Sequence, residues 1–151
     1  MIHPLSECNS LNVDSTTNIW QYVVILPNAI IGQNCNICAH CFIENDVIIG
    51  NNVTIKSGVY LWDGITIDDN VQIGPNVTFT NDKYPRAKKE FELQRILIKR
   101  KASIGAGAVI LGGVTIGENA MIGAGSIVTK DIPANQLWVG SPAKFVRVLE
   151  F

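Results

Sequence analysis

The sequence predicts an all-β fold, a parallel β-helix with three-sided coils, and a six-residue repeat is the first observation behind this prediction. A large apolar residue recurs at every sixth position from Val13 to Phe79, and the spacing resumes from Ile98 to Val128. An α-helix repeats every 3.6 residues and a strand every 2, so neither keeps this register alone. Short strands separated by tight turns do keep it, and three six-residue units then close a coil of 18 residues.

The residues between these anchors supply two further observations. A small or β-branched residue follows most anchors after four positions, as at Cys35, Cys41 and Ala108. Glycine or asparagine recurs between anchors, where a tight corner needs unusual backbone angles. Each unit is therefore predicted to form one flat side, with its anchor and its small residue directed into the core.

The elements follow in order from this repeat. The eighteen anchors predict about six coils in one domain. Backbone hydrogen bonds run between coils, so both ends of the stack need a cap. The predicted domain, residues 1–151, comprises an N-terminal cap (1–12), a β-helix (13–133) with a looped insertion (80–97), and a short C-terminal cap (134–151).

Length and composition exclude several classes of protein. The chain has 151 residues, of which 47% are apolar and 17% charged, and its net charge is −1. These values exclude a disordered chain and give no support to a nucleic-acid binder. The longest strongly apolar runs have four or five residues, so no segment is expected to cross a membrane. Because the N-terminal residues show no secretory signal, we expect a cytoplasmic protein whose four cysteines are free thiols.

A segment rich in basic residues interrupts the repeat. Residues 83–101 contain eight of the twelve basic residues, against two acidic ones, Glu90 and Glu92. A charged loop is often only a solvated surface. Because insertions at the corners of repeat proteins often carry function, the alternative is a cradle in which Arg86 or a lysine meets a diphosphate or coenzyme A.

Four segments carry a resemblance to a known family, namely residues 41–46, 56–64, 79–86 and 139–144. Together with the repeat, they resemble the left-handed β-helix of hexapeptide-repeat acyltransferases, closest to the sugar-nucleotide N-acetyltransferases that act on dTDP-3-amino-3,6-dideoxyhexoses. The resemblance implies a left-handed coil, acetyl-CoA as the acyl donor, and a nucleotide-linked amino sugar as the acceptor. It also implies a homotrimer with active sites between subunits, and a place in the biosynthesis of surface glycans such as the O-antigen.

The candidate catalytic residues are Asn81, Asp82 and His40. Asn81 matches the Phe-Thr-Asn stretch of related acetyltransferases, and its amide can orient an amine by accepting a hydrogen bond but cannot take the proton. Asp82 either holds the sugar or accepts the proton, and the alternative is a turn-forming Asn-Asp pair. His40 is either a base or a structural histidine. Without a strong base, the thiolate leaving group is the final proton acceptor.

Aromatic and acidic residues form the predicted acceptor site, and small residues form the predicted coenzyme A site. Carboxylates bind sugar hydroxyls and aromatic rings cover a thymine or a pyranose, although such residues also suit a trimer interface. Glycine and alanine allow a ligand to approach the backbone, and lysines bind phosphates. The predicted acceptor-binding residues are Glu44, Tyr60, Trp62, Asp63, Tyr84 and Arg86. The predicted coenzyme A residues are Ala106, Gly107, Ala124, Gly125, Lys130 and Lys144.

Three cysteines, Cys35, Cys38 and Cys41, have a spacing that resembles a metal motif. Two of them occupy the inward small-residue position of successive units, so they are expected to face the core as small apolar side chains. No metal is therefore expected.

Two alternatives stay open at this point. One keeps the fold and the donor but changes the acceptor to a UDP-linked amino sugar or another small amine or alcohol. The other is a non-catalytic β-helix that serves as a scaffold. The loop and the pairs Trp62-Asp63 and Asn81-Asp82 count against the scaffold, because the packing of a β-helix requires none of them.

Overall fold

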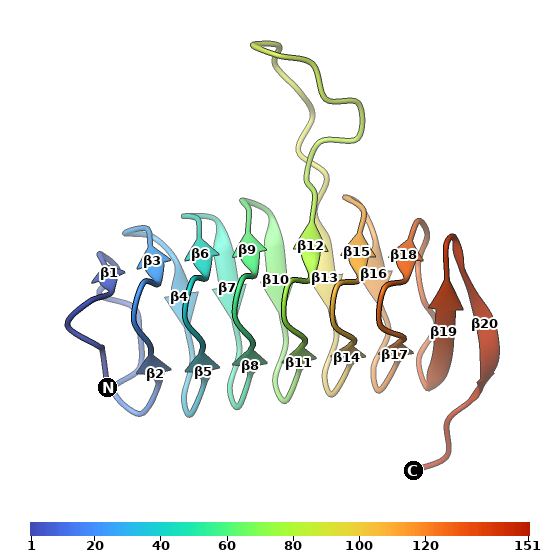
Figure 1. Cartoon of the computed structure of the whole chain (residues 1–151), viewed down its shortest axis with the longest axis horizontal. Coiled ribbons are helices and arrows are strands. Elements are labelled where there is room, and N and C mark those ends of the chain that lie inside the picture. Colours follow the sequence, from blue (N-terminus) through green and yellow to red (C-terminus); the bar gives the residue numbers. More distant parts are fainter.

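The computed structural model describes residues 1–151 and contains twenty strands. The chain winds into a left-handed parallel β-helix of about seven turns, whose axis runs from the N-terminal to the C-terminal end in Figure 1. This confirms the all-β fold predicted from the repeat. No helix is present, so none is long and apolar enough to span a membrane.

Three sheets form the three sides of the β-helix, and we call them faces 1, 2 and 3 in the order in which a coil visits them. Face 1 consists of β2 (Asn18–Ile19), β5 (Asn36–Ile37), β8 (Thr54–Ile55), β11 (Gln72–Ile73), β14 (Ser103–Ile104), β17 (Met121–Ile122), β19 (Gln136–Gly140) and β20 (Ala143–Val148). Face 2 consists of β1 (Glu7–Cys8), β3 (Val24–Ile25), β6 (Phe42–Ile43), β9 (Tyr60–Leu61), β12 (Thr78–Phe79), β15 (Val109–Ile110) and β18 (Ile127–Val128). Face 3 consists of β4 (Ile30–Ile31), β7 (Val47–Ile49), β10 (Ile65–Ile67), β13 (Ile96–Ile98) and β16 (Thr115–Ile116).

Neighbouring coils pair in register. Ile25 lies beside Ile43 and Ile43 beside Leu61, a step of 18 residues, whereas Phe79 lies beside Ile110, a step of 31. These anchors are buried in one core of 35 apolar residues that runs the length of the β-helix. The insertion is therefore accommodated outside the core, at a corner, and the coils on either side of it stack as if it were absent.

Asparagine has the corner role that the repeat predicts. Ten non-glycine residues have a positive φ, and six of them are asparagine, the side chain that tolerates left-handed backbone best after glycine. His40 is another of the ten, with φ of 63° at the corner between β5 and β6.

The N-terminal residues form a coil where a cap was expected. β1 pairs with β3, and Ile2 bridges to Ile19, so the β-helix has about seven turns and not six. Cys8 lies beside Ile25, only 17 residues away. This coil is one residue shorter than the others, which is why a step of six residues does not find it.

The loop and the C-terminal end complete the architecture. β13 begins at Ile96, so the loop comprises residues 80–95, two fewer than the predicted 80–97. At the C-terminal end, β19 and β20 form an antiparallel hairpin on face 1. Trp138 lies beside Ile122 and is 9% exposed, so its ring covers the last turn of the core.

Candidate active site

The loop of residues 80–95 leaves the β-helix at the corner between faces 2 and 3 and projects away from it (Figure 1). Its two limbs are joined at the root, because the backbone N–H of Gln94 donates to the carbonyl of Asn81 (2.9 Å). The following coil holds the same root, since the backbone N–H of Gly112 donates to the hydroxyl of Thr80 (2.9 Å). A Cβ added at Gly112 would lie 2.7 Å from the Cβ of Gln94, so this close approach needs a glycine.

Asn81 and Asp82 point to opposite sides of the outgoing limb, as consecutive residues of an extended chain do. Asn81 lines a pocket with Glu44, whereas Asp82 lines a different pocket with Lys83. Oδ1 of Asp82 accepts a hydrogen bond from the backbone N–H of Tyr84 (3.1 Å), a local turn contact. The structure therefore does not bring the two adjacent side chains into one site.

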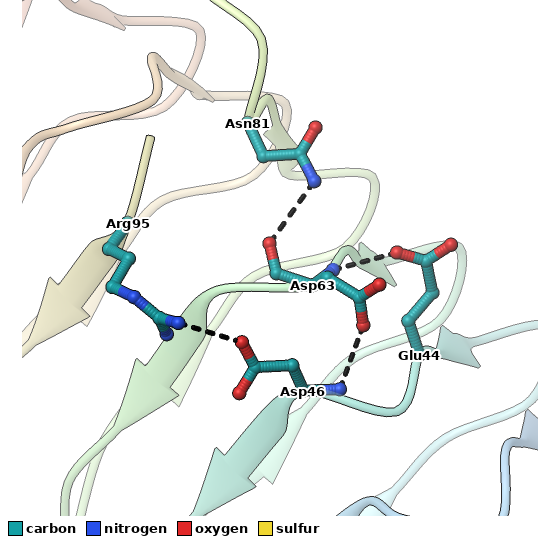
Figure 2. A network of polar contacts seen from close by, with 5 residues as sticks. All are labelled: Glu44, Asp46, Asp63, Asn81 and Arg95. Atoms are coloured by element: carbon teal, nitrogen blue, oxygen red, sulfur yellow. Dashed lines mark hydrogen bonds and ion pairs between the residues drawn. The ribbon is translucent and has the colours of Figure 1, made fainter. Parts of the chain in front are cut away.

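A network of hydrogen bonds surrounds the side chain of Asn81 (Figure 2). The backbone N–H of Asp63 donates to Oε2 of Glu44 (2.7 Å), and Oδ1 of Asp63 accepts from the backbone N–H of Asp46 (2.7 Å). Nδ2 of Asn81 donates to the carbonyl of Asp63 (3.1 Å). Arg95, on the returning limb of the loop, forms an ion pair of 3.0 Å with Asp46. Residues from three successive coils are thereby linked at one corner.

The network leaves three acceptor atoms without a partner in the protein. Because a carbonyl can only accept, the contact with Asp63 identifies the bonded atom of Asn81 as Nδ2, and Oδ1 remains free. Oε1 of Glu44 and Oδ2 of Asp63 are also free (Figure 2). Three free acceptors without a free donor favour a ligand that donates hydrogen bonds, such as an amine or a set of hydroxyls.

These atoms line a cavity of about 460 Å³, which we call the acidic pocket. Its three carboxylates are balanced by only one guanidinium, so the pocket has an excess of negative charge. Such a charge attracts an amine and disfavours a phosphate. The indole N–H of Trp62 donates to the carbonyl of Phe79 (2.9 Å), which holds the indole at the rim. The lining residues are Glu44, Asp46, Trp62, Asp63, Asn81, Phe91 and Leu93.

A second cavity of about 440 Å³, which we call the lysine pocket, lies on the other side of the loop root. Lys83 and Lys130 line it, together with Asp82, Gly112 and Gly113. Two lysines beside accessible backbone suit an anionic ligand. The predicted coenzyme A residue Lys130 therefore lies near the loop, next to two glycines that the sequence analysis did not single out.

His40 lies at the opposite edge of face 2 from Asn81. Its ring stacks on that of Tyr22 with the centroids 5.1 Å apart. It lines an open, mainly apolar groove of about 470 Å³ that also contains Tyr60 and Trp62. Trp62 is the one residue that borders both this groove and the acidic pocket. The structure thus brings the predicted aromatic residues together but does not bring His40 to Asn81.

The tip of the loop directs its side chains to solvent. The ammonium of Lys83 lies 5.6 Å from the ring centroid of Tyr84, which is 76% exposed. The guanidinium of Arg86 donates to the carbonyl of its neighbour Pro85 (2.9 Å). Neither Tyr84 nor Arg86 reaches the acidic pocket, so the basic tip and the acidic pocket are separate regions of charge.

The small residues predicted to bind coenzyme A lie at the corners between faces 1 and 2. Ala106 and Gly107 form one exposed corner, and Ala124 and Gly125 form the next. Nothing lies within 4 Å of a Cβ added at Gly107 or Gly125, so the space beside them is open. They share this edge of face 2 with His40. The remaining predicted residue, Lys144, is exposed on β20.

Burial keeps the core thiols protonated. Desolvation raises the pKa of Cys41 to about 11 and also raises the pKa of Cys35, and both residues are 2% exposed. Cys38 is half-buried outside the core. Because a cysteine binds metal as the thiolate, the two buried thiols have the properties of packing residues. No group of three His, Cys, Asp or Glu side chains is arranged to hold a metal ion.

The sequence analysis missed four residues of this site, namely Asp46, Phe91, Leu93 and Arg95. Asp46 lies directly after the Glu44-Asn45 pair of a segment that the analysis had noted. The other three alternate along the returning limb, so a period of two in residues 91–95 was the available signal. Their position beside Asp63 depends on the return of the loop to its own corner, which no local pattern indicates.

Comparisons with known proteins agree with this architecture. The family described as bacterial transferase hexapeptide (six repeats) matches residues 46–81 and 95–130, and the hexapeptide repeat of succinyl-transferase matches residues 28–62. The chain is 57% identical over 144 residues to dTDP-3-amino-3,6-dideoxy-α-D-galactopyranose 3-N-acetyltransferase of Aneurinibacillus thermoaerophilus. That match covers 95% of this chain and 75% of the relative.

Solved structures with the same fold include two acetyltransferases with bound ligands. A mutant of perosamine N-acetyltransferase from Caulobacter crescentus, in complex with CoA and GDP-perosamine, superposes with a TM-score of 0.77 at 25% identity, covering 87% of this chain but only 57% of its own. A hexapeptide-repeat acetyltransferase from Vibrio cholerae, in complex with acetyl-CoA, superposes with a TM-score of 0.64 at 32% identity, covering 82% of this chain and 69% of its own. The repeat, the fold and these similarities together show that the chain belongs to the hexapeptide-repeat transferases.

Proposed function

We propose that this protein transfers the acetyl group of acetyl-CoA to the 3-amino group of a dTDP-3-amino-3,6-dideoxyhexose. The observation that carries the proposal is the free Oδ1 of Asn81 in a pocket whose other free polar atoms are carboxylate oxygens. The high identity to a relative named for this reaction supports the choice of acceptor, with the galacto epimer first.

The acidic pocket is suited to the amino sugar. Glu44 Oε1 and Asp63 Oδ2 accept hydrogen bonds from sugar hydroxyls, and Asn81 Oδ1 accepts one from the amine. The bond from Asn81 Nδ2 to Asp63 fixes the direction of that amide oxygen. The amine is thereby oriented with its lone pair toward the thioester, and proximity supplies most of the rate.

The reaction balances without a side-chain base. The neutral amine attacks the thioester carbonyl, a C–N bond forms, and the C–S bond breaks with release of the thiolate of coenzyme A. The nitrogen then loses one proton, and the thiolate accepts it, giving an acetamide and free coenzyme A. We assign no base role to His40, because it lies at the opposite edge of face 2 and stacks on Tyr22.

The charges of the molecule separate the two halves of the substrate. The amine and hydroxyls belong in the acidic pocket, whereas the diphosphate belongs with the basic tip of the loop, where Lys83 and Arg86 are exposed. An arginine binds a phosphate through two parallel hydrogen bonds, and its single contact with Pro85 leaves donors for this purpose. Tyr60 and Trp62 lie in the groove beside the pocket and offer their rings to a thymine or a pyranose.

Coenzyme A requires a second subunit in this scheme. The small corners at Gly107 and Gly125 and the loop that carries Asn81 lie at opposite edges of face 2. One donor molecule contacts both only if the loop of one subunit faces the small corners of the next. We therefore infer a homotrimer with three active sites between subunits. Since acetyl-CoA and nucleotide sugars are metabolites of the cytoplasm, we place the reaction there, in the synthesis of a surface glycan.

The test is thiol release from acetyl-CoA in the presence of dTDP-3-amino-3,6-dideoxygalactose, its gluco epimer, and a UDP-linked amino sugar in parallel. Rapid release with a dTDP sugar is expected. Release only with the UDP sugar would replace the acceptor but keep the transferase. No release with any acceptor and no binding of acetyl-CoA in calorimetry would favour a scaffold.

A further inference from the structure

The returning limb of the loop gives the acidic pocket an apolar wall. Along residues 91–95 the side chains alternate in direction, as in an extended chain. Phe91 and Leu93 line the acidic pocket, and Arg95 belongs to the hydrogen-bond network beneath it. Gln94 lines the lysine pocket on the other side. The pocket therefore has polar atoms from the coils on one side and apolar side chains from the loop on another.

Leu93 has a fixed position in this wall. Gly64 has a φ of +96°, and a Cβ added there would lie 3.2 Å from Cδ2 of Leu93, so the leucine rests directly on the glycine backbone. The same corner is tied on both sides, because the Gly64 N–H donates to the Asp46 carbonyl (2.8 Å) and the Ile96 N–H donates to the Gly64 carbonyl (3.1 Å). Leu93 is half-buried and Phe91 is 51% exposed, so Leu93 is the better ordered of the two.

The two kinds of surface match the two kinds of group on a 6-deoxy amino sugar. Such a sugar has donors on its ring, namely the amine and the hydroxyls, and one methyl group at C6. The carboxylates and Asn81 satisfy the donors, but a methyl group gains nothing from them. An apolar wall favours the methyl, and it disfavours a hydroxymethyl group because the added hydroxyl loses its hydrogen bonds with water there.

We propose that Leu93, supported by Phe91, is a specificity-determining residue that selects acceptors with a methyl group at C6 over acceptors with a hydroxymethyl group. This inference rests on the proposed function, because it names the part of the acceptor that the returning limb contacts. Leu93 touches no reacting atom, so it changes the choice between acceptors and not the chemical step.

The experiment measures kcat/KM for two acceptors that differ only at C6, dTDP-3-amino-3,6-dideoxygalactose and dTDP-3-amino-3-deoxygalactose. The wild type is expected to prefer the 6-deoxy acceptor by about 10- to 100-fold. Leu93→Ala is expected to lower kcat/KM for the 6-deoxy acceptor about tenfold and to leave the other within about twofold, so that the preference falls. Leu93→Met keeps an apolar side chain of similar volume and is expected to keep the preference.

Two further variants separate specificity from folding. Leu97→Ala is the matched control, since Leu97 is a half-buried leucine on face 3 that lines neither pocket beside the loop. Phe91→Ala removes an exposed side chain and is expected to lower the preference less than Leu93→Ala, even where Leu93→Ala fails to fold. An unchanged preference in both pocket variants, or a fall of equal size in Leu97→Ala, would overturn the inference and leave the proposed function intact. Absence of turnover with both acceptors in the wild type would overturn both.

Discussion

The two edges of face 2 are built in different ways. At the loop edge, side chains bond to the backbone of the neighbouring coil, as Asn81 does to Asp63 and Glu44 does to Asp63. At the opposite edge, His40 stacks on Tyr22 and the glycine corners leave open space. The first edge holds polar atoms in fixed directions, which suits chemistry, whereas the second offers an open surface, which suits the binding of an extended ligand.

The largest expected effect comes from removing the amide at the loop edge. Asn81→Ala is expected to lower kcat by about 100-fold, because the amine loses the acceptor that orients it. The matched change at the opposite edge, His40→Ala, is expected to leave kcat within about twofold, since a stacking contact orients no reacting group. Steady-state kinetics with both substrates saturating measures this difference. A loss of 100-fold in His40→Ala, with an unchanged melting temperature, would reverse the roles of the two edges.

A pH titration tests the core beneath the opposite edge. Desolvation raises the pKa of Cys41 to about 11 from an ordinary value of 9.0. The folded protein therefore keeps the thiol proton where the unfolded chain has lost it. The free energy of unfolding is unaffected below about pH 9 and falls between about pH 9 and 11, by on the order of 2 kcal/mol.

Urea unfolding at pH 8 and at the alkaline end of this range measures that decline. Cys41→Ala serves as the control, because it lacks the thiol and is expected to lose less stability between the two pH values than the wild type. An equal decline in both proteins would show that Cys41 is not desolvated in solution.

A methyl group at the loop root is expected to have a smaller but still clear effect. Gly112→Ala places a Cβ against Gln94 and close to Asn81, so we expect kcat/KM to fall by about tenfold as the root moves. The φ of Gly112 is not positive, so the backbone itself tolerates alanine. Thr80→Val removes the acceptor for the Gly112 N–H and is expected to act in the same direction, whereas Thr80→Ser is expected to restore activity. Full activity in Gly112→Ala would separate the root contact from catalysis.

The smallest effect is expected for the exposed ion pair. Arg95 and Asp46 have side chains that are 65% and 48% exposed, so Arg95→Gln is expected to change the free energy of unfolding by less than about 1 kcal/mol. The KM for the acceptor is expected to rise by about threefold at low ionic strength and by less at high ionic strength, because salt screens an exposed pair. A change in kcat instead of KM would place Arg95 closer to the reacting atoms than the network suggests.

Much of the site was predictable wherever it follows the repeat. Asn81, Asp63 and Glu44 were named from the sequence, and they occupy the corners of three successive coils, where the period of the repeat places them. Asp82 was named with Asn81 because the two are adjacent, but alternation along an extended limb directs them into different pockets. His40 was named as one of only two histidines, a reason that carries no information about position.

The sequence by itself determined the β-helix, its three-sided coils, the position of the loop and the identity of the buried anchors. This was possible because each coil repeats the same local choice, and stacking only adds up these choices. Tertiary structure alone decided what the loop does at its corner. Arg95 reaches Asp46 and Leu93 rests on Gly64 because the returning limb packs against a coil that it follows by about thirty residues, a contact between segments that share no pattern.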